Sequence, residues 1–158
     1  MLKRVNDTNG AITRLDLAQF FAGETLAAGY FEDRLGRVRR SFVVKIEGRQ
    51  VPGGFVLEEE FHYSDGAIEH RTWRMWVSDD GASFTGSTTD VEGEAKGVVE
   101  GLSARLTYTM SVPVGNRRIS MRFADAMHLM PDGTLLAHAV VSKFGVTLGH
   151  VIISFRKA

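Results

Sequence analysis

Residues 55–76 read FVLEEEFHYSDGAIEHRTWRMW and predict two antiparallel strands joined by a tight turn. The Ser-Asp-Gly sequence suits a three-residue loop in which Gly66 takes the left-handed conformation. Closing this loop places Glu59 directly opposite Arg71, whereas a two-residue loop would pair Glu60 with Arg71 instead. The first register is favoured because it collects the large apolar residues on one face: Phe55, Leu57, Phe61, Tyr63, Trp73 and Met75.

An acid and a base on an apolar strand face require a physical reason, because a buried ion pair is a poor stabiliser. The Glu59–Arg71 pair has two interpretations: a brace between two strands, or a polar anchor in a ligand cavity. In the cavity, Arg71 would meet a carboxylate or phosphate head group and Glu59 would orient it. Arg40 and Asp125 also fall on otherwise apolar strand faces, which favours the cavity.

Apolar and polar residues alternate with period two from about residue 24 to the end of the chain. Residues 37–48, 102–112 and 118–123 show this alternation most clearly, and turn sequences recur at strand-length intervals. The pattern predicts an all-β fold: a single antiparallel up-and-down β-barrel of about nine or ten strands. A two-sheet sandwich is the alternative, but the short connections favour the barrel, whose closure leaves no exposed edge.

Helical periodicity is convincing only near the start of the chain. We expect residues 1–14 to be irregular and residues 15–22 to form a short helix. Thr13 would be its N-cap and Asp16 an acid in its first turn. No linker or repeat divides the remainder, so residues 1–158 are predicted to form one barrel domain.

Residues 93–101 would make an unusual strand, because one face carries only Gly93, Ala95, Gly97, Val99 and Gly101. Inside a barrel, such a face leaves empty volume or makes room for a bulky group opposite. Trp73 and Trp76 could fill that volume, or the glycines could form bulges.

Composition excludes several functional classes. Cysteine is absent, so the chain has no disulfide, thiol nucleophile or thiolate metal site. Nineteen basic and nineteen acidic residues cancel, and the basic run at residues 34–40 is interpreted as a solvated strand face. The five histidines lack the spacing of a metal site, and no Gly-x-Ser-x-Gly sequence marks a hydrolase. We therefore expect no metal, no cofactor and no nucleic-acid partner.

The first twenty residues lack the apolar core of a signal peptide, and no stretch is apolar enough to span a membrane. These observations predict a soluble protein without a membrane span, most simply cytoplasmic. The sequence leaves the oligomeric state open.

Several stretches occur together in order: FFAGETLAAGYFEDRLGRVRRSF (20–42), LEEEFHYSDG (57–66), EHRTW (69–73), DVEGEAKG (90–97) and SKFG (142–145). In this combination the chain resembles an uncharacterised bacterial family, domain-of-unknown-function family 3833, many of whose members are labelled putative lipoproteins. The resemblance implies a small lipocalin-like (calycin) β-barrel and supplies no activity or catalytic residues. The chain lacks the acylated cysteine of the lipoprotein members and the Gly-x-Trp motif of true lipocalins. Neither envelope anchoring nor a lipocalin ligand is therefore carried over.

The leading hypothesis is a non-catalytic binding protein that holds a hydrophobic or lipid-like anionic small molecule in the barrel, with Arg71 and Arg40 contacting its head group. One alternative is an enzyme on a small hydrophobic substrate, with Glu59 as general base and Arg71 stabilising an anionic intermediate. The other is a filled barrel that acts as an interaction module. The predicted ligand-binding residues are Arg40, Phe42, Leu57, Glu59, Arg71, Trp73, Met75, Leu106, Tyr108 and Asp125.

Overall fold

The computed structural model describes residues 14–158, which form one short helix and ten strands. The helix is α1 (Leu17–Phe20). The strands are β1 (Gly23–Asp33), β2 (Val38–Val51), β3 (Gly54–Tyr63), β4 (Ile68–Val77), β5 (Ser83–Ser87), β6 (Val91–Glu100), β7 (Ser103–Val114), β8 (Arg117–Leu129), β9 (Leu135–Lys143) and β10 (Val146–Lys157).

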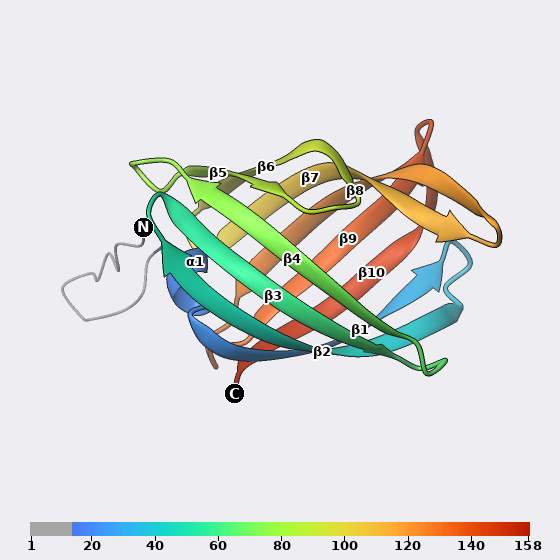
Figure 1. Cartoon of the computed structure of the whole chain (residues 1–158), viewed down its shortest axis with the longest axis horizontal. Helices are drawn as coiled ribbons and strands as arrows, with labels where there is room; N and C mark the ends of the chain where they lie inside the picture. The colour runs from blue at the N-terminus through green and yellow to red at the C-terminus, as the bar shows by residue number, and fades with distance from the viewer. Residues whose placement is uncertain (1–13) are drawn as a thin grey trace.

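Each strand pairs antiparallel with the next along the chain, and β10 pairs with β1, so the sheet closes into a barrel (Figure 1). The predicted all-β, up-and-down architecture is confirmed, and the sandwich alternative is excluded. The wall is least complete beside β5, which is the shortest strand. Among the described residues, β4 pairs with β5 only through Arg74–Val77, so residues 68–73 of β4 have no strand neighbour on that side.

The β3–β4 hairpin has the register that its turn predicts. Glu59 pairs with Arg71, and the Tyr63 N–H donates to the Ala67 carbonyl at 2.9 Å. Gly66 has a φ of +89°, the left-handed conformation that glycine adopts at little cost. The acid and the base consequently share the inward face with the large apolar residues of both strands.

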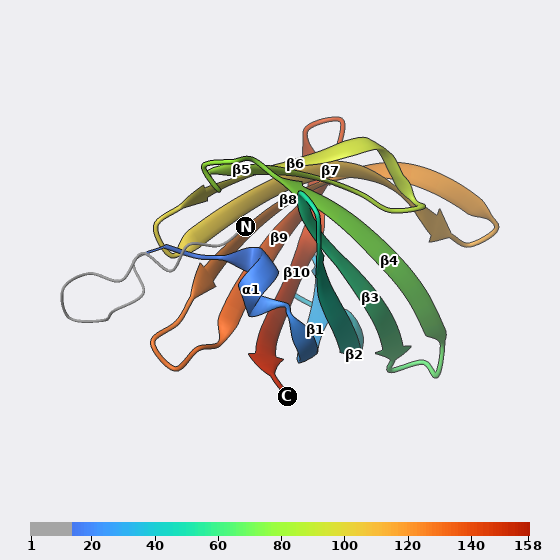
Figure 2. The same cartoon turned by 60° about the vertical axis from the view of Figure 1, so that its left-hand side comes forward.

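Helix α1 lies across one end of the barrel (Figure 2). Its N-cap is Asp16, whose carboxylate accepts a hydrogen bond from the Gln19 N–H at 3.0 Å. The predicted helix over residues 15–22 was therefore too long, because Asp16 precedes the helix and caps it rather than lying in its first turn. Thr13, the predicted cap, lies outside the described residues. The helix and its flanks join the barrel core through Leu15, Leu17, Ala18 and Phe21.

The interior is divided along the barrel axis into a packed half and an open half. In the packed half, next to α1, inward residues such as Ile46, Phe55 and Leu135 are fully buried. The open half lies at the opposite end, toward the β1–β2, β3–β4, β7–β8 and β9–β10 loops (Figure 1). Most inward aromatic side chains there remain partly exposed. The packed half supplies most of the apolar burial that stabilises the fold.

The side-chain-poor face of β6 turns inward, and Phe84 of β5 fills the space beside it. The Phe84 ring occupies the position that a Cβ on Gly97 would take. Trp76 does not fill this space as predicted, because it alternates with Trp73 along β4 and points outward, 49% exposed. A register shift between β6 and β7 accompanies Gly93, whose φ is +67°, as the bulge alternative predicted.

We expect Gly97→Val to destabilise the fold by about 1–3 kcal/mol, because the new side chain overlaps the buried Phe84 ring. Phe84→Ala alone should cost about 3–5 kcal/mol through the cavity that it leaves. In the double variant the valine occupies part of that cavity, so the two costs should be clearly less than additive in urea unfolding. Additive costs would contradict this packing. The control variant is Lys96→Val, because Lys96 lies next to Gly97 on β6 and points outward.

Candidate functional site

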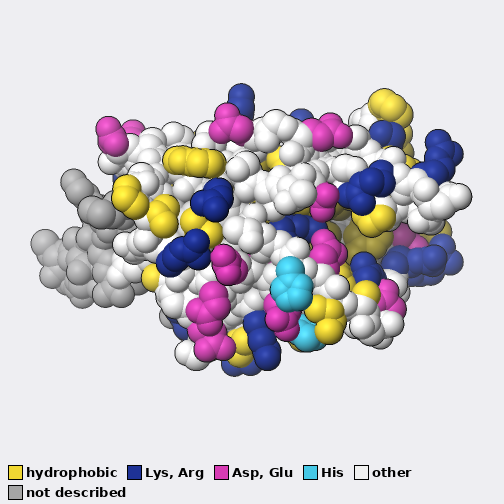
Figure 3. Space-filling view, viewed as in Figure 1, with side chains coloured by type: hydrophobic (Ala, Val, Ile, Leu, Met, Phe, Trp, Pro, Cys, Tyr) yellow, Lys and Arg dark blue, Asp and Glu magenta, His cyan; other side chains and the backbone are white. Residues whose placement is uncertain are grey.

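Aromatic side chains line the open half of the barrel interior. Phe61 stacks with Tyr63, with ring centroids 5.7 Å apart, and Tyr108 stacks with Phe123 at 5.1 Å. Figure 3 shows the molecule hollowed at this end, with hydrophobic side chains in the depth of the hollow. We call this region the chamber; its inward aromatic residues are Phe31, Phe42, Phe61, Tyr63, Tyr108 and Phe123, all partly exposed.

Glu59 places a carboxyl group on this aromatic wall. Its Oε1 atom is buried and has no hydrogen-bond partner among the described residues. Burial raises the pKa of the Glu59 carboxyl to about 7, against the smaller lowering effects of the Arg71 charge and a hydrogen bond from the Trp73 side chain. A carboxyl with this pKa is about half protonated near neutral pH, so it can donate a hydrogen bond as well as accept one.

Arg71 pairs with Glu69 rather than with Glu59. The Arg71 Nη2 atom lies 2.6 Å from Glu69 Oε1, and the Tyr63 hydroxyl donates to Glu69 Oε2 at 3.1 Å. The Arg71 side chain is 18% exposed and that of Glu69 39%. The predicted Glu59–Arg71 ion pair was wrong although its register was correct. Glu69 lies closer to the open end, where both charges keep part of their hydration, and this lowers the cost of pairing.

Asp125 of β8 supplies a second buried carboxyl. The Tyr108 hydroxyl donates to Asp125 Oδ2 at 3.3 Å, while Asp125 Oδ1 is buried without a partner among the described residues. Burial raises the pKa of Asp125 to about 7, and the hydrogen bond from Tyr108 lowers it less. Burial also raises the pKa of Tyr108 well above its usual value, and the charges of Asp125, Arg71 and Glu59 all act on its hydroxyl. Both carboxyls and the guanidinium therefore surround one tyrosine.

The other predicted site residues divide between the rim of the barrel and its core. Arg40 lies at the rim, where its Nε is 2.9 Å from Asp65 Oδ2 and its guanidinium carbon lies 3.4 Å from the centroid of the Tyr63 ring. Phe42 lines the chamber, 5.8 Å from Phe61 between ring centroids. The remaining four belong to the packed core, below the chamber: Leu57, Trp73, Met75 and Leu106.

Sequence reasoning missed Glu69, Tyr63 and Phe123 as parts of this site. Glu69 is two residues from Arg71 on the same strand, so period-two alternation already placed both on one face. Phe123 shared its predicted apolar face with Asp125 in the same way. Alternation therefore predicted that these residues face inward, but it could not show which of the inward residues form the site.

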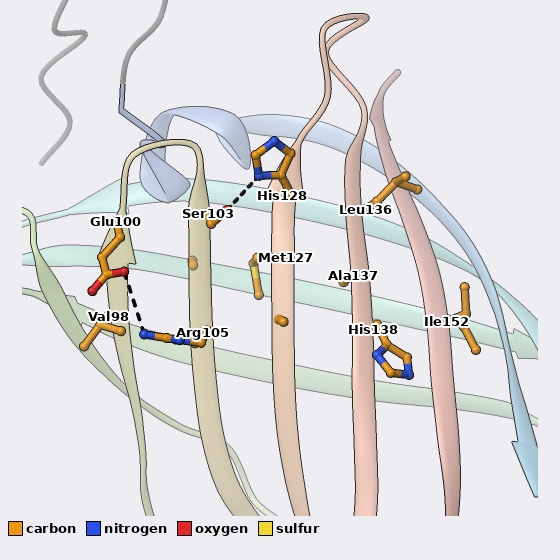
Figure 4. Close-up of a pocket in the computed structure, with 12 residues that line it drawn as sticks. Val98, Glu100, Ser103, Arg105, Met127, His128, Leu136, Ala137, His138 and Ile152 are labelled. Carbon is orange, nitrogen blue, oxygen red and sulfur yellow. Dashed lines mark hydrogen bonds and ion pairs between the residues drawn. The ribbon is translucent and has the colours of Figure 1, made fainter. Parts of the chain in front are cut away.

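Two grooves lie on the outer wall, away from the chamber. One, of about 630 Å³, extends over β6 to β10 and is shown in Figure 4. In it, Ser103 Oγ lies 2.6 Å from His128 Nδ1, and His138 Nε2 lies 2.9 Å from Nδ1 of His150, which is outside the groove lining. The other, of about 640 Å³, lies over β1 to β3 and β10. Among residues 14–158, no three side chains are grouped as a metal site would require.

The chamber is a stronger candidate for a ligand site than either groove. The polar side chains of the outer groove are exposed and already hydrogen-bonded to one another. The chamber instead combines aromatic walls with carboxyl oxygens that are buried and unsatisfied, which is the combination that favours binding of a small molecule.

The fold and this site define an up-and-down antiparallel β-barrel with one end covered by a helix and polar groups in its open half. The chain belongs to the family described as protein of unknown function DUF3833, whose model matches residues 2–157. An S-type phycobiliprotein lyase from Guillardia theta has a similar structure, with a TM-score of 0.67 over 90% of each chain and 5% sequence identity. At that identity the likeness shows the fold alone. Comparison with curated proteins finds no match.

Among residues 14–158, no helix has the length and hydropathy that crossing a membrane requires.

We expect Glu59→Gln to stabilise the protein in a pH-dependent way. The pKa of Glu59 is raised in the folded state, so the folded protein keeps a proton that the unfolded chain releases above its ordinary value of 4.5. The free energy of unfolding consequently falls as the pH rises from about 4.5 to about 7, and it levels off above about pH 7. At about pH 8 the variant should exceed the wild type by at most about 3 kcal/mol, and at about pH 4.5 the two should nearly coincide.

Urea unfolding at the two pH values measures this difference. Asp125→Asn should show the same dependence, because burial raises the pKa of Asp125 to about 7 as well. Glu94→Gln, on the exposed face of β6, is the control and should change stability little at either pH. A gain for Glu59→Gln that is equal at both pH values would show that Glu59 is solvated.

Proposed function

We propose that this protein is a non-catalytic binding protein that holds a hydrophobic or lipid-like anionic small molecule in the chamber. The observation that carries the proposal is a pair of buried carboxyl oxygens, Glu59 Oε1 and Asp125 Oδ1, that have no hydrogen-bond partner within residues 14–158 and lie in an aromatic interior. In a barrel built for stability alone, such oxygens are a net cost, because each loses water without gaining a hydrogen bond. A ligand with a polar head group would supply the missing partners.

The electrostatics of the chamber favour an anionic head group. Burial raises the pKa of both acids to about 7, so near neutral pH a large share of them is uncharged and does not repel an anion. In that form each carboxyl donates a hydrogen bond to a carboxylate or phosphate oxygen. Arg71 adds a positive charge whose partner, Glu69, is itself partly exposed.

The aromatic walls favour an apolar ligand body. Phe42, Phe61, Tyr108 and Phe123 offer ring faces and edges around the polar cluster, and Trp73 contacts Tyr108 from the core below. Below them, the packed core sets a floor, so a ligand would enter from the open end and keep its body near the aromatic rings. The likeness to a phycobiliprotein lyase supports the barrel only, and the ligand class rests on the residues of this chain.

Binding of a fluorescent fatty acid, with displacement by unlabelled fatty acids, tests the proposal. Arg71→Gln should weaken fatty-acid binding by about tenfold or more, because a charge-assisted hydrogen bond contributes about 1.5–3 kcal/mol. The matched variant Arg74→Gln, on the outer face of the same strand, should bind like the wild type. The corresponding fatty alcohol should be nearly insensitive to either change. No binding at all, or equal losses in the two variants, would refute the proposal.

A catalytic role is the second candidate, and one observation favours it. A Glu59 pKa of about 7 suits a general base at neutral pH, and the Arg71 charge acts on the same carboxyl. Glu59→Gln separates the two functions: it should abolish turnover of a small hydrophobic substrate in an enzyme, whereas in a binding protein it should mainly alter affinity or stability. The filled interaction module is less favoured, because the aromatic side chains of the open half remain partly exposed.

A further inference from the structure

Four hairpin loops surround the open end of the barrel and carry large apolar side chains that face solvent. These are the β1–β2, β3–β4, β7–β8 and β9–β10 loops, all at the end away from α1 (Figure 1). Phe144 at the β9–β10 tip is 91% exposed and Leu35 at the β1–β2 tip 70%. We call these loops the rim; its other exposed large hydrophobic residues are Val38, Ile68, Val114 and Val146.

The β9–β10 loop exposes its aromatic residue at a conformational cost. Phe144 and Gly145 form a two-residue turn with φ values of +52° and +77°, between the paired residues Lys143 and Val146. Asn-Gly is the usual sequence for such a turn, because a bulky residue is strained at positive φ. The ring contacts only the Lys143 ammonium among the described interactions, at 4.5 Å from its centroid. The barrel therefore gains little from a phenylalanine at this position.

The rim also concentrates positive charge in a chain whose formal net charge is zero. The rim with its flanking strand residues, taken together with the β5–β6 loop at the same end, comprises residues 32–40, 64–68, 88–92, 112–122 and 143–147, which contain eight basic and five acidic residues. The rest of the chain therefore carries the opposite excess. Figure 3 shows Lys and Arg side chains gathered at this end of the molecule. The eight bases are Arg34, Arg37, Arg39, Arg40, Arg117, Arg118, Arg122 and Lys143.

Several of these charges are available to a partner. Asp33 engages two rim arginines, Asp65 engages Arg40, and Asp90 engages Arg118. Within residues 14–158, Arg34, Arg117 and Arg122 take part in no ion pair. Exposed apolar tips among unpaired cations match the interface of an anionic lipid bilayer, where rings enter the head-group region and cations meet lipid phosphates.

We propose that the rim docks the open end of the barrel on the surface of an anionic lipid bilayer. The apolar tips of Phe144 and Leu35 enter the interface, and the unpaired arginines contact the anionic head groups. This contact is peripheral, since only side chains at loop tips enter the lipid. It rests on the rim residues alone and stands independently of whether the chamber holds a ligand.

Flotation with lipid vesicles tests the proposal on the full chain. The wild type should bind vesicles of phosphatidylcholine mixed with phosphatidylglycerol, and high salt should weaken that binding. Phe144→Asn places the residue preferred by the turn at the tip, so it should preserve or raise thermal stability while lowering vesicle binding about tenfold. Arg34→Gln and Arg117→Gln should each lower binding about fivefold.

The matched control is Leu136→Ser, which removes an exposed apolar side chain from the outer wall of β9, away from the rim. It should bind vesicles like the wild type. Failure of the wild type to bind the mixed vesicles would overturn the proposal and leave a protein partner as the rim's occupant. Equal losses for Leu136→Ser and Phe144→Asn, or equal binding to pure phosphatidylcholine, would also overturn it.

Discussion

Period-two alternation leaves β3 no way to expose Glu59 to bulk water without also exposing Phe55 and Leu57. The register of the hairpin is set by its Ser-Asp-Gly turn, and a slip of one residue would turn the whole apolar face outward. Burial of each large apolar side chain contributes about 1.5–3 kcal/mol, so the apolar face determines which way the strand points. The acid is carried inside with it, and this burial raises the pKa of the Glu59 carboxyl to about 7.

The division of the barrel into two halves makes this cost tolerable. Helix α1 and the inward residues around Ile46 and Phe55 form a buried, packed core. Stability therefore does not depend on filling the other half, where carboxyls and tyrosines remain among partly exposed rings. The Tyr63–Glu69–Arg71 chain lies between the buried acids and solvent. Arg71 and Glu69 both keep part of their hydration, which lowers the cost of pairing the two charges beside the buried Glu59.

The sequence was sufficient to predict the barrel, its strand alternation and the hairpin register, because each follows from local turn chemistry and period two. It could not predict that Arg71 pairs with Glu69, since both acids lie on the same face and only their relative hydration decides between them. Nor could it predict that Phe84 fills the space beside Gly97: the two are cross-strand partners in the β5–β6 hairpin, whose register no short turn sequence sets in the way that Ser-Asp-Gly sets that of β3–β4. The helix cap was misplaced because Asp16 suits both a cap and a first turn.

The chamber and the rim lie at the same end of the barrel, but the charges of their side chains differ. The rim is rich in cations, among them three arginines that take part in no ion pair within residues 14–158, while the chamber behind it holds acids whose burial favours the neutral form. An anionic amphiphile would be attracted by the first and would meet hydrogen-bond donors in the second. Because the apolar floor prevents deeper entry, its head group would lie beside Arg71, at the boundary where charge is still partly hydrated. On both of our proposals, the ligand and the bilayer surface meet the described barrel at the same end.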